Sequence, residues 1–127
     1  MTDFATRTNP APSDDRTWVV CLCAEWCGAC REYRPLFEQV ARAHPRLRFA
    51  WVDIEDHADL ADDFDVETFP TLLIAGASGT HFLGPLLPHA QTLERLLGAL
   101  QPAQAPAPEV AALLDALGRE PADFSIA

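Results

Sequence analysis

Residues 18–30 read WVVCLCAEWCGAC, an apolar run of strand length followed by a Cys-x-x-Cys pair. The run from Trp18 to Ala24 is typical of a strand buried on both faces of a sheet. Because side chains alternate along a strand, Cys21 and Cys23 are predicted to share one face. The Cys-x-x-Cys pair itself opens a segment with helical spacing of apolar residues. The pair is therefore predicted to lie at the junction of a buried strand and a helix.

The apolar spacing outward from this stretch predicts the order β-α-β-α-β-β-α. The strands are expected at residues 18–24, 47–54, 71–75 and 81–83, and the helices at residues 30–44, 58–64 and 91–100. The first two strands are joined through a helix and should be parallel, whereas the last two should form a hairpin. The sequence therefore predicts an α/β fold with a mixed sheet.

Two segments lie outside this unit, which we place at residues 18–101. Residues 1–17 include two prolines and are expected to form a flexible lead-in. Residues 102–127 begin with PAQAPAP, a composition typical of a stiff linker. A further helix is expected over Glu109 to Leu117, and its leucine stripe must be buried either on the domain or on a partner protein.

The net charge is −10, from 9 basic and 19 acidic residues among 127. Nucleic acid and anionic membranes attract clustered Lys or Arg, so this balance disfavours both as partners. The apolar stretches are too short to span a membrane, and residues 1–15 lack the apolar core typical of a signal peptide. We therefore expect a cytoplasmic protein. Thiols stay reduced there, and a cysteine pair is more often catalytic or metal-binding than structural.

The site predicted from these residues is a dithiol formed by Cys27 and Cys30. The unsatisfied N–H groups and partial positive charge at a helix N-terminus stabilise a thiolate, so Cys27 is expected to be the attacking sulfur. Cys30 lies one turn later and further buried, where it can displace a mixed disulfide. The electrons reside on the two sulfurs, so no bound cofactor is expected.

The other two cysteines leave alternatives open. Free cysteines in buried strands behave as small hydrophobes, which favours core packing for Cys21 and Cys23. Cys21 is predicted to face the same side as the dithiol, so it is also a candidate auxiliary thiol or regulatory disulfide partner. The spacing C-x-C-x3-C-x2-C raises a zinc or iron–sulfur site. Two cysteines on a rigid strand and two at a helix start fit such sites poorly, and we expect no metal.

The cysteine segment and three later positions resemble one known family. Trp26-Cys27-Gly28-Ala29-Cys30 is similar to the active-site motif of the thioredoxin family, with Ala29 where thioredoxins usually carry proline. Pro35 matches the proline that kinks the helix of the family. Phe69-Pro70-Thr71 resembles the loop with a cis-proline that faces the dithiol, and Gly84 resembles the glycine that helps to shape the substrate groove.

The resemblance extends over roughly two-thirds of the chain and implies a thioredoxin-like fold, a central mixed sheet flanked by helices on both faces. It implies a thiol–disulfide oxidoreductase that exchanges disulfides with protein substrates and is oxidised to a Cys27–Cys30 disulfide. A reductase, such as thioredoxin reductase, would regenerate the dithiol. The implied substrate-contact residues are Trp26, Gly28, Ala29, Phe69, Pro70 and Gly84, with Pro70 in the cis form.

Cys21 and Trp51 depart from the family pattern. Thioredoxins carry a buried aspartate where this chain has Cys21, and the buried lysine of their second strand corresponds to Trp51. The proton step of Cys30 would then use Glu25, water or no specific group. The strand and helix that begin ordinary thioredoxins are predicted to be missing or reduced. An alternative function is a thioredoxin-fold module that binds a protein through its C-terminal helix and has incidental redox activity.

Overall fold

The computed structural model describes residues 17–24, 27–61, 64, 66, 68–105 and 107–119. The predicted lead-in therefore lies outside the described residues, apart from Thr17. Within the described part of the chain, a four-stranded sheet is formed by β1 (Trp18–Cys23), β2 (Arg48–Asp53), β3 (Thr71–Gly76) and β4 (Gly79–Pro85). None of the helices in these ranges is both long and apolar enough to cross a membrane.

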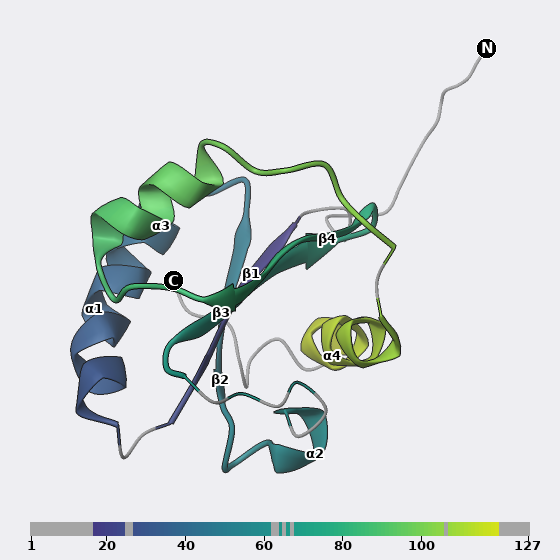
Figure 1. Ribbon diagram of the computed structural model, residues 1–127, viewed down its shortest axis with the longest axis horizontal. Helices are drawn as coiled ribbons and strands as arrows, with labels where there is room; N and C mark the ends of the chain where they lie inside the picture. The colour runs from purple at the N-terminus through teal and green to yellow at the C-terminus, as the bar shows by residue number, and fades with distance from the viewer. Residues whose placement is uncertain are drawn as a thin grey trace.

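The sheet is mixed and has the strand order β2-β1-β3-β4 (Figure 1). β1 pairs with β2 in parallel and with β3 antiparallel, and β3 and β4 form an antiparallel hairpin. The predicted parallel pair and hairpin are both confirmed. β1 is thus an inner strand, with a neighbour on each side.

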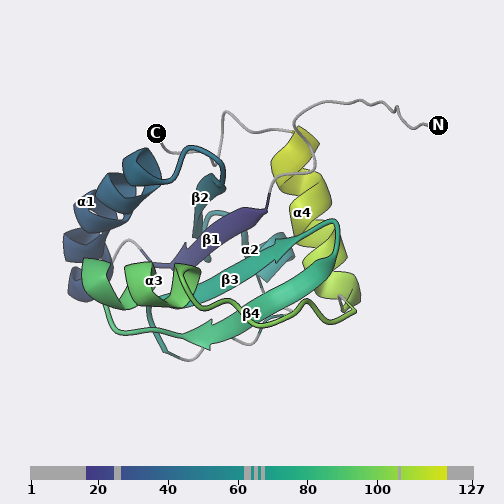
Figure 2. The ribbon, with the colours of Figure 1, turned by 90° about the horizontal axis from the view of Figure 1, so that it is seen from above.

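Four helices cover the two faces of the sheet: α1 (Gly28–Ala43), α2 (Ala58–Ala61), α3 (Ala90–Leu97) and α4 (Pro108–Arg119). The helices α1 and α3 lie together on one face, whereas α2 and α4 lie on the other (Figures 1 and 2). The predicted α/β fold with helices on both faces of a mixed sheet is confirmed.

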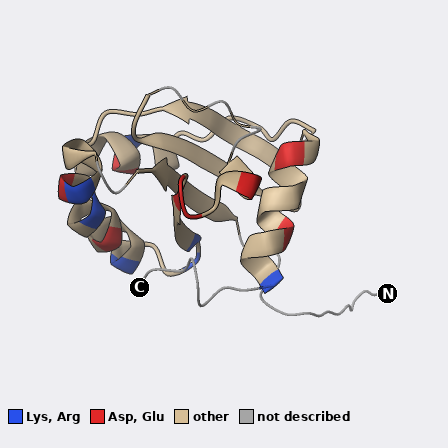
Figure 3. Cartoon of the chain, turned by 90° about the horizontal axis from the view of Figure 1, so that it is seen from below, with Lys and Arg blue, Asp and Glu red and all other residues tan. Residues whose placement is uncertain are grey.

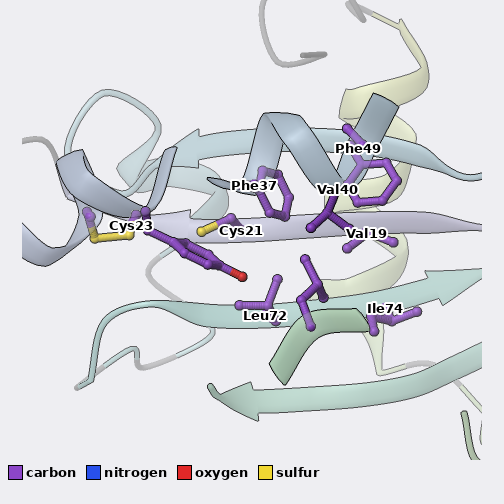
Figure 4. Packing of buried hydrophobic residues seen from close by; sticks show 12 residues of the cluster. Val19, Cys21, Cys23, Phe37, Val40, Phe49, Leu72 and Ile74 are labelled. Atoms are coloured by element: carbon purple, nitrogen blue, oxygen red, sulfur yellow. A yellow bond between two sulfur atoms is a disulfide. The ribbon is translucent and has the colours of Figure 1, made fainter. Parts of the chain in front are cut away.

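The first core lies between the sheet and the helices α1 and α3 (Figure 4). Its buried side chains are Val19, Cys21, Cys23, Cys30, Tyr33, Phe37, Val40, Ala41, Phe49, Leu72, Ile74 and Leu93. The Phe37 ring lies edge-on to Phe49 and Trp51, with centroids 5.4 and 5.7 Å away. His44 Nε2 lies 2.6 Å from Glu94 Oε1 on α3. These contacts join the middle of α1 to β2 and its C-terminal end to α3, and so hold the helix against the sheet.

The second core lies on the opposite face of the sheet, under α4. Its buried side chains are Trp18, Val20, Leu22, Ala50, Val52, Leu73, Ala75, Val110, Leu113 and Leu117. The β1 members of this core alternate with those of the first core, so the predicted period of two is confirmed. Both faces of β1 are covered, which explains why its sequence is an uninterrupted apolar run.

The chain beyond α3 returns along β4, the last strand in the sheet order. Thr80 and Gln104 exchange two backbone hydrogen bonds, of 2.8 and 2.9 Å. Gly79 has a φ of 121°, and a Cβ at this position would collide with the carbonyl of Gln104. His81 Nδ1 also donates to the carbonyl oxygen of Gln101 over 2.8 Å. The segment is therefore held against β4 before the chain reaches α4.

Candidate functional site

The four cysteines gather where β1 ends and α1 begins. Cys21 and Cys23 lie on the face of β1 that meets α1, and both are fully buried. Cys27 is the residue before α1 and is half-buried. Cys30 lies in the first turn of the helix and is 1% exposed. Cys27 is therefore the cysteine that solvent reaches most easily.

Backbone hydrogen bonds hold the start of α1. The N–H of Cys27 donates to the carbonyl of Ala24 over 3.0 Å, and the N–H of Arg31 donates to the carbonyl of Cys27 over 3.1 Å. Cys27 is the N-cap residue of α1, so it lies beside the partial positive charge of the helix N-terminus, and its side chain makes no capping hydrogen bond. Glu25 and Trp26, the predicted proton-transfer and substrate-contact residues, lie outside the described residues.

The disulfide of the structure joins Cys23 to Cys30, with Cα atoms 6.0 Å apart (Figure 4). The predicted bond, Cys27–Cys30, is not the one observed, and Cys27 and Cys21 are free thiols. The physical reason is the docking of α1 on the sheet. It places the first turn of the helix over the end of β1, where the Cys23 side chain points toward the helix. Cys30 thus has two neighbouring cysteines. Cys23 lies opposite it on β1, and Cys27 lies about one turn earlier, before the start of α1.

A metal site, the alternative raised by the four cysteines, would require several of them to converge on one ion. Two of them are instead joined to each other in the disulfide. Among the residues that the structure describes, no group of three or more His, Cys, Asp or Glu side chains could hold a metal ion.

The loop before β3 lies next to the cysteine segment. Thr71, the first residue of β3, pairs with Leu22 near the end of β1, so the preceding Phe69-Pro70 stretch approaches the point where β1 ends. The peptide bond between Phe69 and Pro70 is cis, in agreement with the resemblance. The Thr71 hydroxyl donates to the carbonyl of Thr68 over 2.6 Å. Phe69 and Cys27 both pack against the first core.

The remaining predicted contact residues are divided between two places. Gly28 and Ala29 begin α1 directly after Cys27, and both are exposed. Gly84 lies in β4 opposite Leu72 of β3, two strands away from β1 in the sheet. The structure therefore brings Gly28 and Ala29 to the accessible thiol, whereas Gly84 lies further along the same end of the sheet.

A pocket of about 260 Å³ opens beside Cys30 on the side of β2. It is lined by Ala24, Cys30, Arg31, Arg34, Trp51, Asp53 and Asp56. Asp53 is the last residue of β2, and Asp56 lies in the turn that follows it; Figure 3 shows the acidic residues of the described chain in red. The Arg34 guanidinium lies 5.2 Å from the centroid of the Trp51 ring. The pocket is large enough for water, which fits the predicted use of water in the proton step. Sequence reasoning missed this pocket, although Trp51, one of its lining residues, departs from the family pattern.

The fold and the cysteine segment have counterparts among known proteins. Residues 4–85 match the thioredoxin family model, and this range covers more than half of the chain. The chain belongs to the thioredoxin family. The family predicted from the cysteine motif is therefore confirmed.

Individual thioredoxins share part of this sequence and its fold. "Putative thioredoxin 2" of Streptomyces coelicolor is 37% identical over 79 residues, which cover 61% of this chain and 59% of the relative. "Thioredoxin H-type" of Fagopyrum esculentum is 32% identical over 81 residues, which cover 64% of this chain and 60% of the relative. The chain thus spans about 60% of the length of these relatives. The X-ray structure of Fasciola hepatica thioredoxin matches with a TM-score of 0.61 and 26% identity, over 67% of this chain and 81% of that one.

Cys21 occupies the position at which the thioredoxin resemblance places a buried acid. Burial raises the pKa of the Cys21 thiol well above its ordinary value of 9.0, and the charge of Arg34 opposes this only in part. Burial and the proximity of Cys21 also raise the pKa of Tyr33, whose hydroxyl has no hydrogen-bond partner among the described residues. Both groups are therefore uncharged at neutral pH. A thiol held in its protonated form fits core packing better than proton transfer.

The raised pKa of Cys21 predicts a loss of stability at alkaline pH. The unfolded thiol loses its proton above pH 9.0 while the folded one keeps it, so the unfolded state binds fewer protons and stability falls as pH rises. The limit for one group is about 1.4 kcal/mol per pH unit. In urea unfolding of the fully reduced proteins, the stability advantage of the wild type over Cys21→Ala should shrink between pH 9.0 and 10.0. A constant difference over this range would contradict the assignment.

Proposed function

We propose that the chain is a thiol–disulfide oxidoreductase that acts on protein disulfides through Cys27 and Cys30. One observation carries this proposal. An accessible thiol, Cys27, lies at the N-terminus of α1, one turn before a buried cysteine that forms a disulfide. The membership of the thioredoxin family supports the same chemistry.

The reaction begins with attack of the Cys27 thiolate on one sulfur of a substrate disulfide. A bond forms between Cys27 and the substrate, and the displaced substrate thiolate takes a proton from solvent. The Cys30 thiolate then attacks the Cys27 sulfur, which releases the second substrate thiol. Two electrons pass to the substrate and leave a Cys27–Cys30 disulfide, so the chemistry needs no bound cofactor. The pocket beside Cys30 offers room for the water that accepts its proton.

The substrate would lie between the start of α1 and the loop before β3. Gly28 and Ala29 are exposed and carry little side chain, so an extended segment can approach Cys27 over them. The backbone of Phe69, before the cis bond to Pro70, would pair with that segment. Trp26 and Gly84 complete the proposed contact residues.

The dithiol must be returned to its reduced form by an electron donor. A reductase such as thioredoxin reductase would supply two electrons to the oxidised pair. A cytoplasmic location would keep the thiols reduced between turnovers. Consumption of NADPH in the presence of the chain, a thioredoxin reductase and insulin tests this partner, because no consumption above that of the reductase alone would contradict it.

Trapping of mixed disulfides tests the proposed function. A Cys30→Ser variant cannot resolve the first intermediate, so it should hold substrates on Cys27 as adducts that dithiothreitol releases. Cys23→Ala is added to remove the other thiol that the structure places beside residue 30. A matched variant with Cys27→Ser in the same background should trap nothing. Equal trapping by both variants, or none by either, would overturn the proposal.

The alternative of a protein-binding module has less support. That reading requires the apolar stripe of the C-terminal helix to be available to a partner. In the structure Val110, Leu113 and Leu117 of α4 are buried against the sheet of the same chain. The stripe is therefore already covered.

A further inference from the structure

We propose that Cys23 is a third redox-active thiol, which takes the disulfide over from Cys27 and returns Cys27 to its free thiol form. The proposal rests on the proposed function, because that reaction first makes the Cys27–Cys30 bond. The observation behind it is that Cys30, the resolving cysteine of that reaction, is bonded to Cys23 while Cys27 is free.

The backbone of Cys23 is fixed by the sheet. Cys23 pairs with Asp53 of β2, and its carbonyl accepts a 2.9 Å hydrogen bond from the N–H of Ile54. Its side chain lies on the face of β1 that meets α1 and is fully buried in the first core. Cys21 shares this face but lies two residues earlier, about 7 Å back along the strand. Cys23 is therefore the strand cysteine that the fold holds under the first turn of α1.

Cys30 has a second partner on the helix side. Cys27 precedes it by three residues, and residues with this spacing lie on the same side of a helix. Rotation of the Cys30 side chain would turn its sulfur from Cys27 toward Cys23. The two alternative disulfides share one sulfur atom, so they exclude each other.

The transfer is an internal thiol–disulfide exchange. The Cys23 thiolate attacks the Cys30 sulfur of the Cys27–Cys30 disulfide, the bond between Cys23 and Cys30 forms, and Cys27 leaves as a thiolate. The proton of Cys23 passes to water, for which the pocket beside Ala24 and Cys30 offers room, and the Cys27 thiolate takes a proton from solvent. No electrons enter or leave the chain, so no further oxidant is needed beyond the substrate disulfide of the proposed function.

Burial gives the exchange its direction. A disulfide is uncharged and suits the first core, where Cys23 is 0% and Cys30 1% exposed. The half-buried Cys27 is the more accessible position for the free thiol. After the transfer a released substrate thiol cannot reach either bonded sulfur, so the reverse reaction is slowed. Reduction would begin with attack of Cys27 on Cys30, which returns the bond to the accessible position.

Disulfide mapping separates the two bonds cleanly. All four cysteines lie between Arg16 and Arg31, so trypsin alone leaves them in one peptide, and a Glu-specific protease divides it after Glu25. The fully reduced chain is treated with one equivalent of dithiobis(nitrobenzoate), an aromatic disulfide, and blocked with N-ethylmaleimide before digestion. A Cys23–Cys30 bond links peptide 17–25 to peptide 26–31. A Cys27–Cys30 bond stays within the second peptide.

In the wild type we expect peptides 17–25 and 26–31 to be linked by a disulfide, with maleimide attached to Cys27. In Cys23→Ala the bond should stay within peptide 26–31 and Cys27 should escape the label. Cys21→Ala, the matched change two residues earlier on the same face, should keep the linked pattern. A wild type whose disulfide lies within peptide 26–31 would overturn the proposal. This measurement uses the wild type alone, so it does not depend on whether a variant folds.

The order of events is tested by Cys27→Ser. Cys23 and Cys30 are buried, so without Cys27 the reagent should form their bond at least about tenfold more slowly. Formation at the wild-type rate would overturn the transfer, because the inner bond would then arise directly. Failure of the proposed function would appear separately, as a wild type that does not reduce insulin. The mapping would still show which sulfurs pair.

Discussion

Serine in place of Cys27 is expected to abolish catalytic disulfide reduction, with a loss of rate of at least about a thousandfold. A serine hydroxyl stays protonated near neutral pH and does not attack a disulfide sulfur. Cys23 and Cys30 are at most 1% exposed, so neither can replace Cys27 as the first sulfur to meet a substrate. The rate is measured as the precipitation of reduced insulin, with dithiothreitol as the electron donor.

The control for this substitution is Ala77→Ser, which introduces the same hydroxyl at an exposed position in the turn between β3 and β4. It leaves every thiol in place and should reduce insulin at the wild-type rate. Far-UV circular dichroism of both variants checks that the fold is kept. Activity retained by Cys27→Ser would assign the attacking sulfur to another cysteine.

Alanine in place of Leu113 is expected to lower the free energy of unfolding by about 2–5 kcal/mol. Leu113 is 0% exposed and lies in the second core with side chains of β1, β2 and β3. Truncation removes apolar contacts and leaves a cavity that the surrounding sheet fills only in part. Urea unfolding followed by circular dichroism measures the difference.

The same truncation at Leu87 serves as the matched control, because this leucine is 65% exposed. Leu87→Ala should change the free energy of unfolding by no more than about 0.5 kcal/mol. Equal losses in the two variants would show that the burial of Leu113 against the sheet does not stabilise the fold. The helix would then have to be stabilised by another protein.

The order of strands and helices along the chain, the parallel pair and the hairpin followed from sequence because local patterns determined them. The uninterrupted apolar run from Trp18 required cover on both faces, and the structure supplies it with one core on each side. The spacing of Tyr33, Phe37 and Val40 defined the buried side of α1 in the same way. The stripe on α4 showed that one side of that helix must be buried, but periodicity does not identify the covering surface.

The pairing of the cysteines could not be read from spacing. The Cys-x-x-Cys motif brings Cys27 and Cys30 together through local helix geometry, which sequence reasoning can follow. The distance from Cys30 to Cys23 depends instead on how α1 packs on the sheet through contacts such as that between Phe37 and Phe49. The alternation of β1 did place Cys23 on the helix face. It gave no reason to choose Cys23 over Cys21.

The backbone pairing of Thr80 with Gln104 has a consequence for behaviour at high concentration. A last strand with free N–H and carbonyl groups is a template onto which a second molecule can add its own strand. Here the returning chain occupies part of that template at the start of β4. The glycine at position 79 is what lets it come so close. The stretch that leads to α4 therefore also protects the start of β4 from edge-to-edge pairing with a second molecule.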